Sequence, residues 1–164
     1  MASIGKIAPC LWFDNQAEEA ARFYVSIFKN SSMGAVSHYG KVGQETHKRP
    51  PGSVMVASFT LDGQEFLALN GGPLFKFNEA VSLMVRCDTQ AEIDYFWDKL
   101  GTAGGGEDGP CGWLKDRYGL SWQIVPANMP WLAADGERAD RTMAAVMQMK
   151  KLDMAALERA YNGT

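Results

Sequence analysis

Two short segments of this chain repeat each other. Residues 14–18 (DNQAE) are echoed 74 positions later by residues 88–92 (DTQAE), and the same offset brings Phe23 opposite Trp97. Four identical residues in a segment of five can arise by chance, but the elements predicted around the two segments also follow the same order. The sequence therefore predicts a strand–helix–strands unit that is used twice.

Each unit predicts one helix that directly follows a buried strand. Over residues 16–29 apolar side chains recur at helical spacing, and Asp14 or Asn15 is placed to cap the first turn. The helix of the second unit is expected over residues 88–100, with Asp88 at its start.

Strands joined by tight turns account for most of the remaining residues. Asp62-Gly63 is a strong signal for a two-residue hairpin, and residues 116–119 (DRYG) mark the matching turn of the second unit. Two Gly- and Pro-rich segments, residues 41–52 and 101–109, are predicted loops. The predicted strands are residues 4–13, 32–40, 53–61 and 64–70 in the first unit and residues 79–87, 111–115 and 120–125 in the second.

The C-terminal part has no counterpart in the first unit. Met143, Val146 and Met147 recur at helical spacing within residues 138–151, and Asp153 is placed to cap a last short helix. The Met-rich face packs either on the rest of the chain or on a second subunit. We expect one structural domain that consists of a first module at residues 1–75, a second module at residues 76–127 and a helical extension at residues 128–164.

Composition narrows the function classes. The chain of 164 residues has a net charge of -3 at pH 7, which argues against the basic surface of a nucleic-acid-binding protein. Its three cysteines do not make a disulfide framework, so we expect free thiols in a reducing compartment. No apolar run approaches the roughly 18 residues of a membrane helix, and the N-terminus lacks a signal-peptide pattern. We therefore expect a cytoplasmic protein with no nucleic-acid or membrane partner.

Four stretches make the chain similar to a known superfamily. FDNQAEEAARFYVSIF (residues 13–28) resembles the vicinal oxygen chelate (glyoxalase/bleomycin-resistance/dioxygenase) superfamily. CDTQAEIDYFWDKL (87–100), CGWLKDRYGLSWQIVP (111–126) and MQMKKLDMAALERAYNG (147–163) resemble its PhnB-like group, which often carries the label 3-demethylubiquinone-9 3-methyltransferase. The resemblance implies an α+β fold: two βαβββ modules form curved mixed sheets around a cavity and a helical tail follows. It also implies a homodimer.

The resemblance also identifies the positions where metal-dependent members of the superfamily carry their ligands. In this chain those positions hold Ile7, Leu67, Val81 and Gln123. One neutral amide and three aliphatic side chains do not supply the oxygen or nitrogen donors that a divalent metal needs. The only histidines, His38 and His47, offer no alternative ligand set. We therefore predict no metal site and no other cofactor.

The sequence names no catalytic residue. The glycine run at residues 104–106 follows a helix, which is the wrong context for a nucleotide-binding turn. Among the cysteines, Cys111 is the best nucleophile candidate because it lies beside a glycine in a predicted hairpin; Cys10 and Cys87 are typical of inert strand residues. Asp116 is a candidate acid or base, although an aspartate at a hairpin turn normally bonds its own backbone.

Strand alternation predicts which side chains face the cavity. If the ligand-equivalent positions face it, so do the residues two apart from them, whereas Cys10 and Trp122 face the helices. The predicted ligand-binding residues are Gln123, Ser121, Ser82, Asn70, Leu11, Phe13 and Trp113. A mostly apolar wall with a few polar groups is typical of a site for a small, partly apolar organic molecule. The alternatives are a metal-independent enzyme of the same superfamily and a dimeric interaction module.

Overall fold

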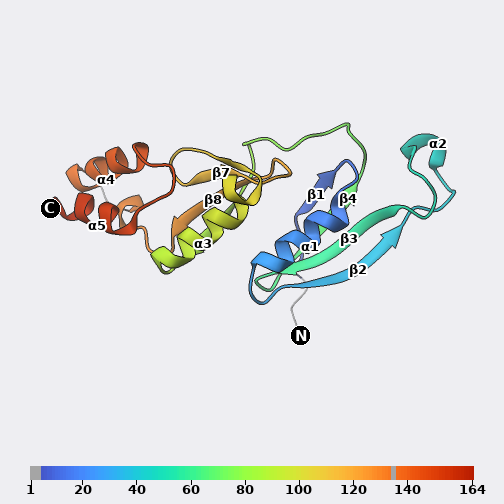
Figure 1. Ribbon diagram of the computed structural model, residues 1–164, viewed down its shortest axis with the longest axis horizontal. Coiled ribbons are helices and arrows are strands. Elements are labelled where there is room, and N and C mark those ends of the chain that lie inside the picture. The colour runs from blue at the N-terminus through green and yellow to red at the C-terminus, as the bar shows by residue number, and fades with distance from the viewer. Residues whose placement is uncertain (1–4, 134–135) are drawn as a thin grey trace. The chain divides into compact units, whose positions relative to one another are not determined.

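The described part of the chain contains two four-stranded sheets. The computed structural model describes residues 5–133 and 136–164. Two compact units, Met1–Lys76 and Phe77–Thr164, each hold one sheet with one helix against it (Figure 1). The predicted α+β class, with two βαβββ modules and C-terminal helices, is confirmed.

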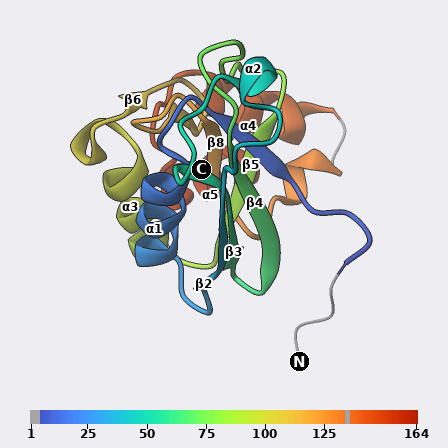
Figure 2. The ribbon, with the colours of Figure 1, turned by 90° about the vertical axis from the view of Figure 1, so that its right-hand side faces the viewer.

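The first unit has the strand order β1-β4-β3-β2. Strands β1 and β4 are parallel and the other neighbours are antiparallel. Helix α1 runs alongside the strands of this sheet (Figure 2). The elements are β1 (Cys10–Phe13), α1 (Ala17–Ile27), β2 (Ser32–His38), α2 (Gln44–His47), β3 (Val54–Leu61) and β4 (Gln64–Asn70).

The second unit repeats this topology. Its order β5-β8-β7-β6 places the first strand parallel to the last and the two middle strands antiparallel, as in the first unit. The elements are β5 (Ser82–Cys87), α3 (Gln90–Leu100), η1 (Thr102–Gly104), β6 (Glu107–Asp108), β7 (Trp113–Lys115), β8 (Ser121–Pro126), η2 (Pro130–Leu132), α4 (Glu137–Met147) and α5 (Met154–Asn162). Two modules with one strand order confirm the repeat inferred from residues 14–18 and 88–92.

Several predicted boundaries need correction. The first strand begins at Cys10, and residue 4, where it was expected to begin, lies outside the described residues. The predicted loop at residues 41–52 contains the short helix α2, and the Gly-rich segment at residues 101–109 contains η1 and β6. Strand β5 begins three residues later than expected, so Glu79 precedes the strand. The Asp62-Gly63 hairpin is confirmed, with both residues at positive φ (46° and 80°).

The two modules begin their helices differently. Neither Asp14 nor Asn15 caps α1, so that prediction is wrong. Asn70 at the end of β4 does so instead: its Oδ1 accepts a hydrogen bond from the Ala17 N–H (2.8 Å), and its Nδ2 donates to the Val54 carbonyl (3.1 Å). The cap is therefore tertiary and buried, because Asn70 is only 5% exposed.

Helix α3 has a local cap. The Thr89 hydroxyl accepts from the Glu92 N–H (3.2 Å), and the Glu92 carboxylate accepts from the Asp88 N–H (2.7 Å). This reciprocal pair is a variant of the capping box. The cap of α3 is thus local in sequence, and the helix begins at Gln90, two residues after the predicted start at Asp88.

Each helix covers one face of its sheet. In the first unit the covered face holds Leu11, Phe13, Ala57, Phe59, Leu61, Phe66 and Ala68, all buried. The Tyr24 ring of α1 stacks on Phe59 at 6.2 Å between ring centroids. Leu11 and Phe13 therefore face the helix, and their expected orientation toward a cavity is wrong. Cys10 was expected to face a helix but is exposed on the other face.

In the second unit the expected orientation is only partly right. Trp122 is buried on the helix-covered face, as predicted, in register with Leu83 on β5 and Leu114 on β7. Leu83 and Val85 share this face, although both were expected on the other one. The physical reason is the same in both modules: the helix must bury its apolar stripe, and it takes the more apolar face of the sheet.

The helical tail packs on the second module. A buried cluster joins Val125 of β8 to Val146, Leu152 and Leu157 of the tail. Backbone bonds from the Cys111 and Gly112 N–H groups to Met149 and Lys150 carbonyls (both 2.7 Å) hold the connection between α4 and α5. Within the Met-rich face Val146 is buried, whereas Met143 and Met147 are 45% and 65% exposed.

The Gln90 side chain of α3 holds the helical tail through two hydrogen bonds. Its Nε2 donates to the Leu152 carbonyl (3.1 Å), and its Oε1 accepts from the Met154 N–H (2.9 Å). Beside it, Lys151 pairs with Asp94 at 2.8 Å. The hydrogen bond with Lys151 lowers the pKa of Asp94, so this ion pair stabilises the fold at neutral pH and stops doing so as the pH falls through that lowered pKa.

Replacing the tertiary cap of α1 tests its contribution. We expect Asn70→Ala to reduce the free energy of unfolding by about 1–3 kcal/mol, because it leaves one buried and one partly buried backbone group without their partners. Asn15→Ala is the matched control and should change stability by less than about 0.5 kcal/mol. Urea unfolding of both variants measures this, and equal effects would contradict the tertiary cap.

A second comparison uses the repeat itself. Gln90→Ala should loosen the tail, because it removes two hydrogen bonds worth about 1 kcal/mol each. We expect hydrogen exchange at the Cys111 and Gly112 amides, which bond to the tail, to accelerate roughly tenfold. Gln16→Ala, at the equivalent position of the first module, should leave these amides unchanged. Unaltered exchange in Gln90→Ala would show that the tail is held without this side chain.

Candidate functional site

The second sheet has a polar face opposite α3, which we call the open face. Residues paired directly on neighbouring strands point to the same side of a sheet, so the register places six side chains there in two adjacent rows. The first row is Ser82, Ser121 and Lys115, and the second row is Met84, Gln123 and Trp113.

Gln123 and Ser82 form a hydrogen-bonded pair across the two central strands of this face. The Gln123 Nε2 donates to the Ser82 Oγ at 2.9 Å. In the part of the chain that the structure describes, the Gln123 Oε1 and the Ser82 hydroxyl hydrogen have no further partner. The pair therefore offers one acceptor and one donor to another molecule.

Ser121 lies between Ser82 and Lys115 and carries an unused hydroxyl. The residue is 1% exposed, and its Oγ has no hydrogen-bond partner within residues 5–133 and 136–164. A buried hydroxyl without a partner costs about 1–3 kcal/mol and is uncommon in native proteins. Its position in the middle of a polar row identifies the open face as the candidate site.

Lys115, at the end of the first row, forms an ion pair with Glu79. Its Nζ lies 2.5 Å from Glu79 Oε1, and both side chains are partly exposed. The hydrogen bond between them lowers the pKa of Glu79 and raises that of Lys115. Both groups are therefore charged at neutral pH. The sequence interpretation missed Lys115, although its spacing of two residues from Trp113 places both on one face.

The structure separates the seven predicted ligand-binding residues. Ser82, Ser121, Gln123 and Trp113 lie together on the open face of the second sheet. Leu11, Phe13 and Asn70 belong to the first unit: the first two face α1, and Asn70 uses its amide to cap that helix.

The residues at the ligand-equivalent positions do not fit a divalent metal. Ile7 and Val81 are 87% and 69% exposed aliphatic side chains, Leu67 is aliphatic, and only Gln123 has a donor atom. Among the described residues, no group of three or more His, Cys, Asp or Glu side chains is arranged to hold a metal ion. No mechanistic step is therefore assigned to a metal.

The glycine run serves packing. A Cβ at Gly104 would collide with the Lys99 carbonyl, and one at Gly106 would collide with the Lys115 carbonyl. These glycines let the loop after α3 approach the backbone closely, a role that explains the run without a nucleotide. Their geometry does not fit the Gly-rich turn after a first strand that typifies nucleotide-binding methyltransferases.

Both carboxylate oxygens of Asp116 accept hydrogen bonds from the hairpin. Its Oδ1 accepts from the Tyr118 and Leu120 N–H groups (2.8 and 3.2 Å), and its Oδ2 accepts from Trp122 Nε1 (2.8 Å). The carboxylate is 3% exposed. The expectation that Asp116 bonds the backbone of its own hairpin turn is therefore confirmed.

The cysteines form no disulfide. Burial, with smaller contributions from Glu92 and Asp88, raises the pKa of Cys87 to about 12, so this thiol is a poor nucleophile. Burial also raises the pKa of Cys10. Cys111 has a left-handed backbone (φ 58°) and packs against the tail cluster, which gives it a structural role.

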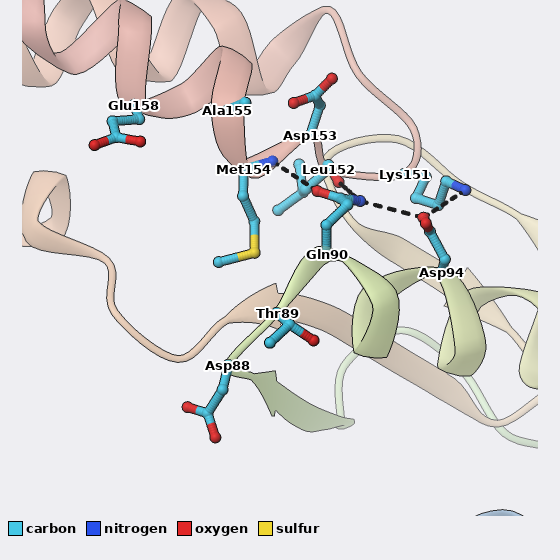
Figure 3. A pocket seen from close by; sticks show the side chains of 10 residues that line it. All are labelled: Asp88, Thr89, Gln90, Asp94, Lys151, Leu152, Asp153, Met154, Ala155 and Glu158. Carbon is cyan, nitrogen blue, oxygen red and sulfur yellow. Dashed lines mark hydrogen bonds and ion pairs between the residues drawn. The ribbon is translucent and has the colours of Figure 1, made fainter.

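A hollow lies where the tail meets α3 (Figure 3). The side chains of Gln90, Asp94 and Lys151 point toward one another there and bond within the hollow. Four carboxylates line it and only one lysine, which disfavours an anion despite the two helix N-termini nearby. The hollow is part of the contact between α3 and the helical tail. Its lining is Asp88, Thr89, Gln90, Asp94, Lys151, Leu152, Asp153, Met154, Ala155 and Glu158.

No helix in the described ranges has both the length and the apolar character needed to cross a bilayer.

No curated protein matches the chain. Solved structures do match it. A PhnB protein from Bacillus cereus is 37% identical, with a TM-score of 0.62 over 74% of this chain and 99% of that one. Protein PA1353 from Pseudomonas aeruginosa is 19% identical, with a TM-score of 0.57 over 74% of this chain and 98% of that one.

A family model supplies the classification. The model described as 3-demethylubiquinone-9 3-methyltransferase matches residues 5–125, which covers both modules and leaves the helical tail outside. The PhnB-like resemblance inferred from the sequence is thereby confirmed. The chain belongs to the family described as 3-demethylubiquinone-9 3-methyltransferase, the PhnB-like group of glyoxalase-fold proteins.

Proposed function

We propose that the chain binds a small, partly apolar organic molecule on the open face of the second sheet, without a metal. The observation that carries the proposal is the buried Ser121 hydroxyl, which has no partner in the described structure and lies beside the Gln123–Ser82 pair. A ligand that bonds to this hydroxyl offsets the cost of having buried it.

The rest of the face supports this function. Trp113 and Met84 flank Gln123 in the second row, and Met84 is 45% exposed. An aromatic ring and a thioether provide apolar contact area, whereas the neighbouring hydroxyls and amide fix the orientation of a ligand. This combination of an apolar surface and few polar groups is typical of small-molecule sites.

The alternative is a metal-independent enzyme of the same superfamily. The Lys115–Glu79 pair favours it, because it places two ionisable groups beside the candidate site. The family description names a methyl transfer, but the glycine run does not supply the expected nucleotide-binding turn. Turnover of a bound compound distinguishes this alternative from binding alone. Assembly as a homodimer and a cytoplasmic location remain predictions of the sequence.

Ser121 gives the decisive test of the proposal. Ser121→Ala should raise the free energy of unfolding of the unliganded protein by about 1 kcal/mol, since it removes an unpaired buried hydroxyl. The same substitution should weaken ligand binding roughly tenfold. Thermal shifts with a library of small aromatic acids, amides and alcohols measure binding, and urea unfolding measures stability.

Two further variants complete this test. Gln123→Leu should abolish the thermal shifts, whereas Gln64→Leu, at an exposed glutamine of the first sheet, should preserve them. A Ser121→Ala protein that is less stable than the parent, or that binds equally well, would contradict the role assigned to the hydroxyl.

A further inference from the structure

The first row of the open face is a row of hydrogen-bond donors. Ser82 accepts from Gln123 and so directs its own hydroxyl hydrogen elsewhere, Ser121 has an unused hydroxyl, and Lys115 has an ammonium group. Direct pairing in the sheet (Ser82 with Ser121, Ser121 with Lys115) makes these three side chains neighbours. Three adjacent donors fit an acceptor-rich, anionic group better than a neutral one.

In the unliganded protein the Glu79 carboxylate is the anion that contacts this row, through Lys115. It does not belong to the sheet, because β5 begins only at Ser82, yet its carboxylate lies 2.5 Å from the Lys115 Nζ. Its side chain is 60% exposed, and that of Lys115 is 39% exposed. An exposed ion pair of this kind contributes little stability, so an incoming carboxylate can exchange with it at small cost.

The direction of approach follows from the neighbouring charges. Glu107 of β6 is paired directly with Lys115 on the side away from β8 and repels a second anion there. On the β8 side Lys115 borders Ser121, which has no charge and an unused hydroxyl. A carboxylate can therefore contact both the ammonium and the hydroxyl only over β8.

We infer that the ligand of the open face carries a carboxylate, which displaces Glu79 from Lys115 and bonds to Ser121, while its apolar part contacts Trp113 and Met84. Glu79 is then an internal competitor that occupies the cationic group in the unliganded protein. The Gln123 Oε1 in the next row adds an acceptor for a hydroxyl or amine on the same molecule. This inference rests on the proposed function and names the chemical class of the ligand.

Matched pairs of compounds test the inference. The probes are 3-phenylpropanoate, 3-phenyllactate and the neutral 3-phenylpropanamide, titrated into the full chain. Backbone amide shifts of Ser121 and Gln123 and the side-chain carbon shifts of Lys115 report binding by NMR. We expect the two carboxylates to bind at least roughly tenfold more tightly than the amide.

Three variants isolate the ion pair. Lys115→Met should remove the preference for carboxylates, and Lys115→Arg should largely restore it. Glu79→Gln should strengthen carboxylate binding several-fold, because the competitor loses its charge, without strengthening amide binding. Lys41→Met and Glu45→Gln, exposed residues of the first unit, are controls that should change neither affinity. Amide spectra confirm that each variant is folded.

The failures of the two proposals differ. Equal binding of amide and carboxylate on the open face, unaffected by Lys115→Met, would overturn the carboxylate inference and leave the proposed function intact. Weaker carboxylate binding in Glu79→Gln would overturn the role of Glu79 as a competitor. If none of the probes shifts Ser121 or Gln123, both the inference and the proposed site are wrong.

Discussion

In each module one long helix packs against a sheet that has two faces, and this constraint organises the molecule. The helix buries its apolar stripe against the more apolar face, which produces the cores around Phe59 in the first unit and Ile124 in the second. The helix leaves the opposite face uncovered by its own side chains, and in the second module the helical tail packs on that face at Val125. In the second module that face holds hydroxyls, an amide and an ammonium group in register, so the packing of α3 determines where polar chemistry is possible.

The duplicated modules solve the same local problems with different contacts. Helix α3 is capped within its own sequence by Thr89 and Glu92, whereas α1 depends on Asn70 from the end of β4. Gln90 and Gln16 occupy equivalent positions, but only the second module has a tail for its glutamine to hold. The repeat thus preserves topology while individual side chains acquire separate roles.

The open face connects this architecture to function. The four ligand-equivalent positions retain one donor, Gln123, and its amide bonds to Ser82. The donors that could replace a metal in recognising an anion are protein groups: the Ser121 hydroxyl and the Lys115 ammonium. In the binding function that we propose, oxygen and nitrogen groups of the sheet take the place of an ion.

The sequence by itself determined the strand–helix–strands repeat and the Asp62-Gly63 hairpin, because short-range spacing and turn chemistry specify them. The resemblance to the superfamily implied the βαβββ form of the two modules. The sequence also singled out Gln123, Ser82, Ser121 and Trp113. Only the tertiary structure decided which strand face each helix covers, and a shift of one residue in that assignment reversed Leu11 and Phe13. The Asn70 cap and the Lys115–Glu79 pair join residues distant in sequence, and no local pattern encodes such contacts.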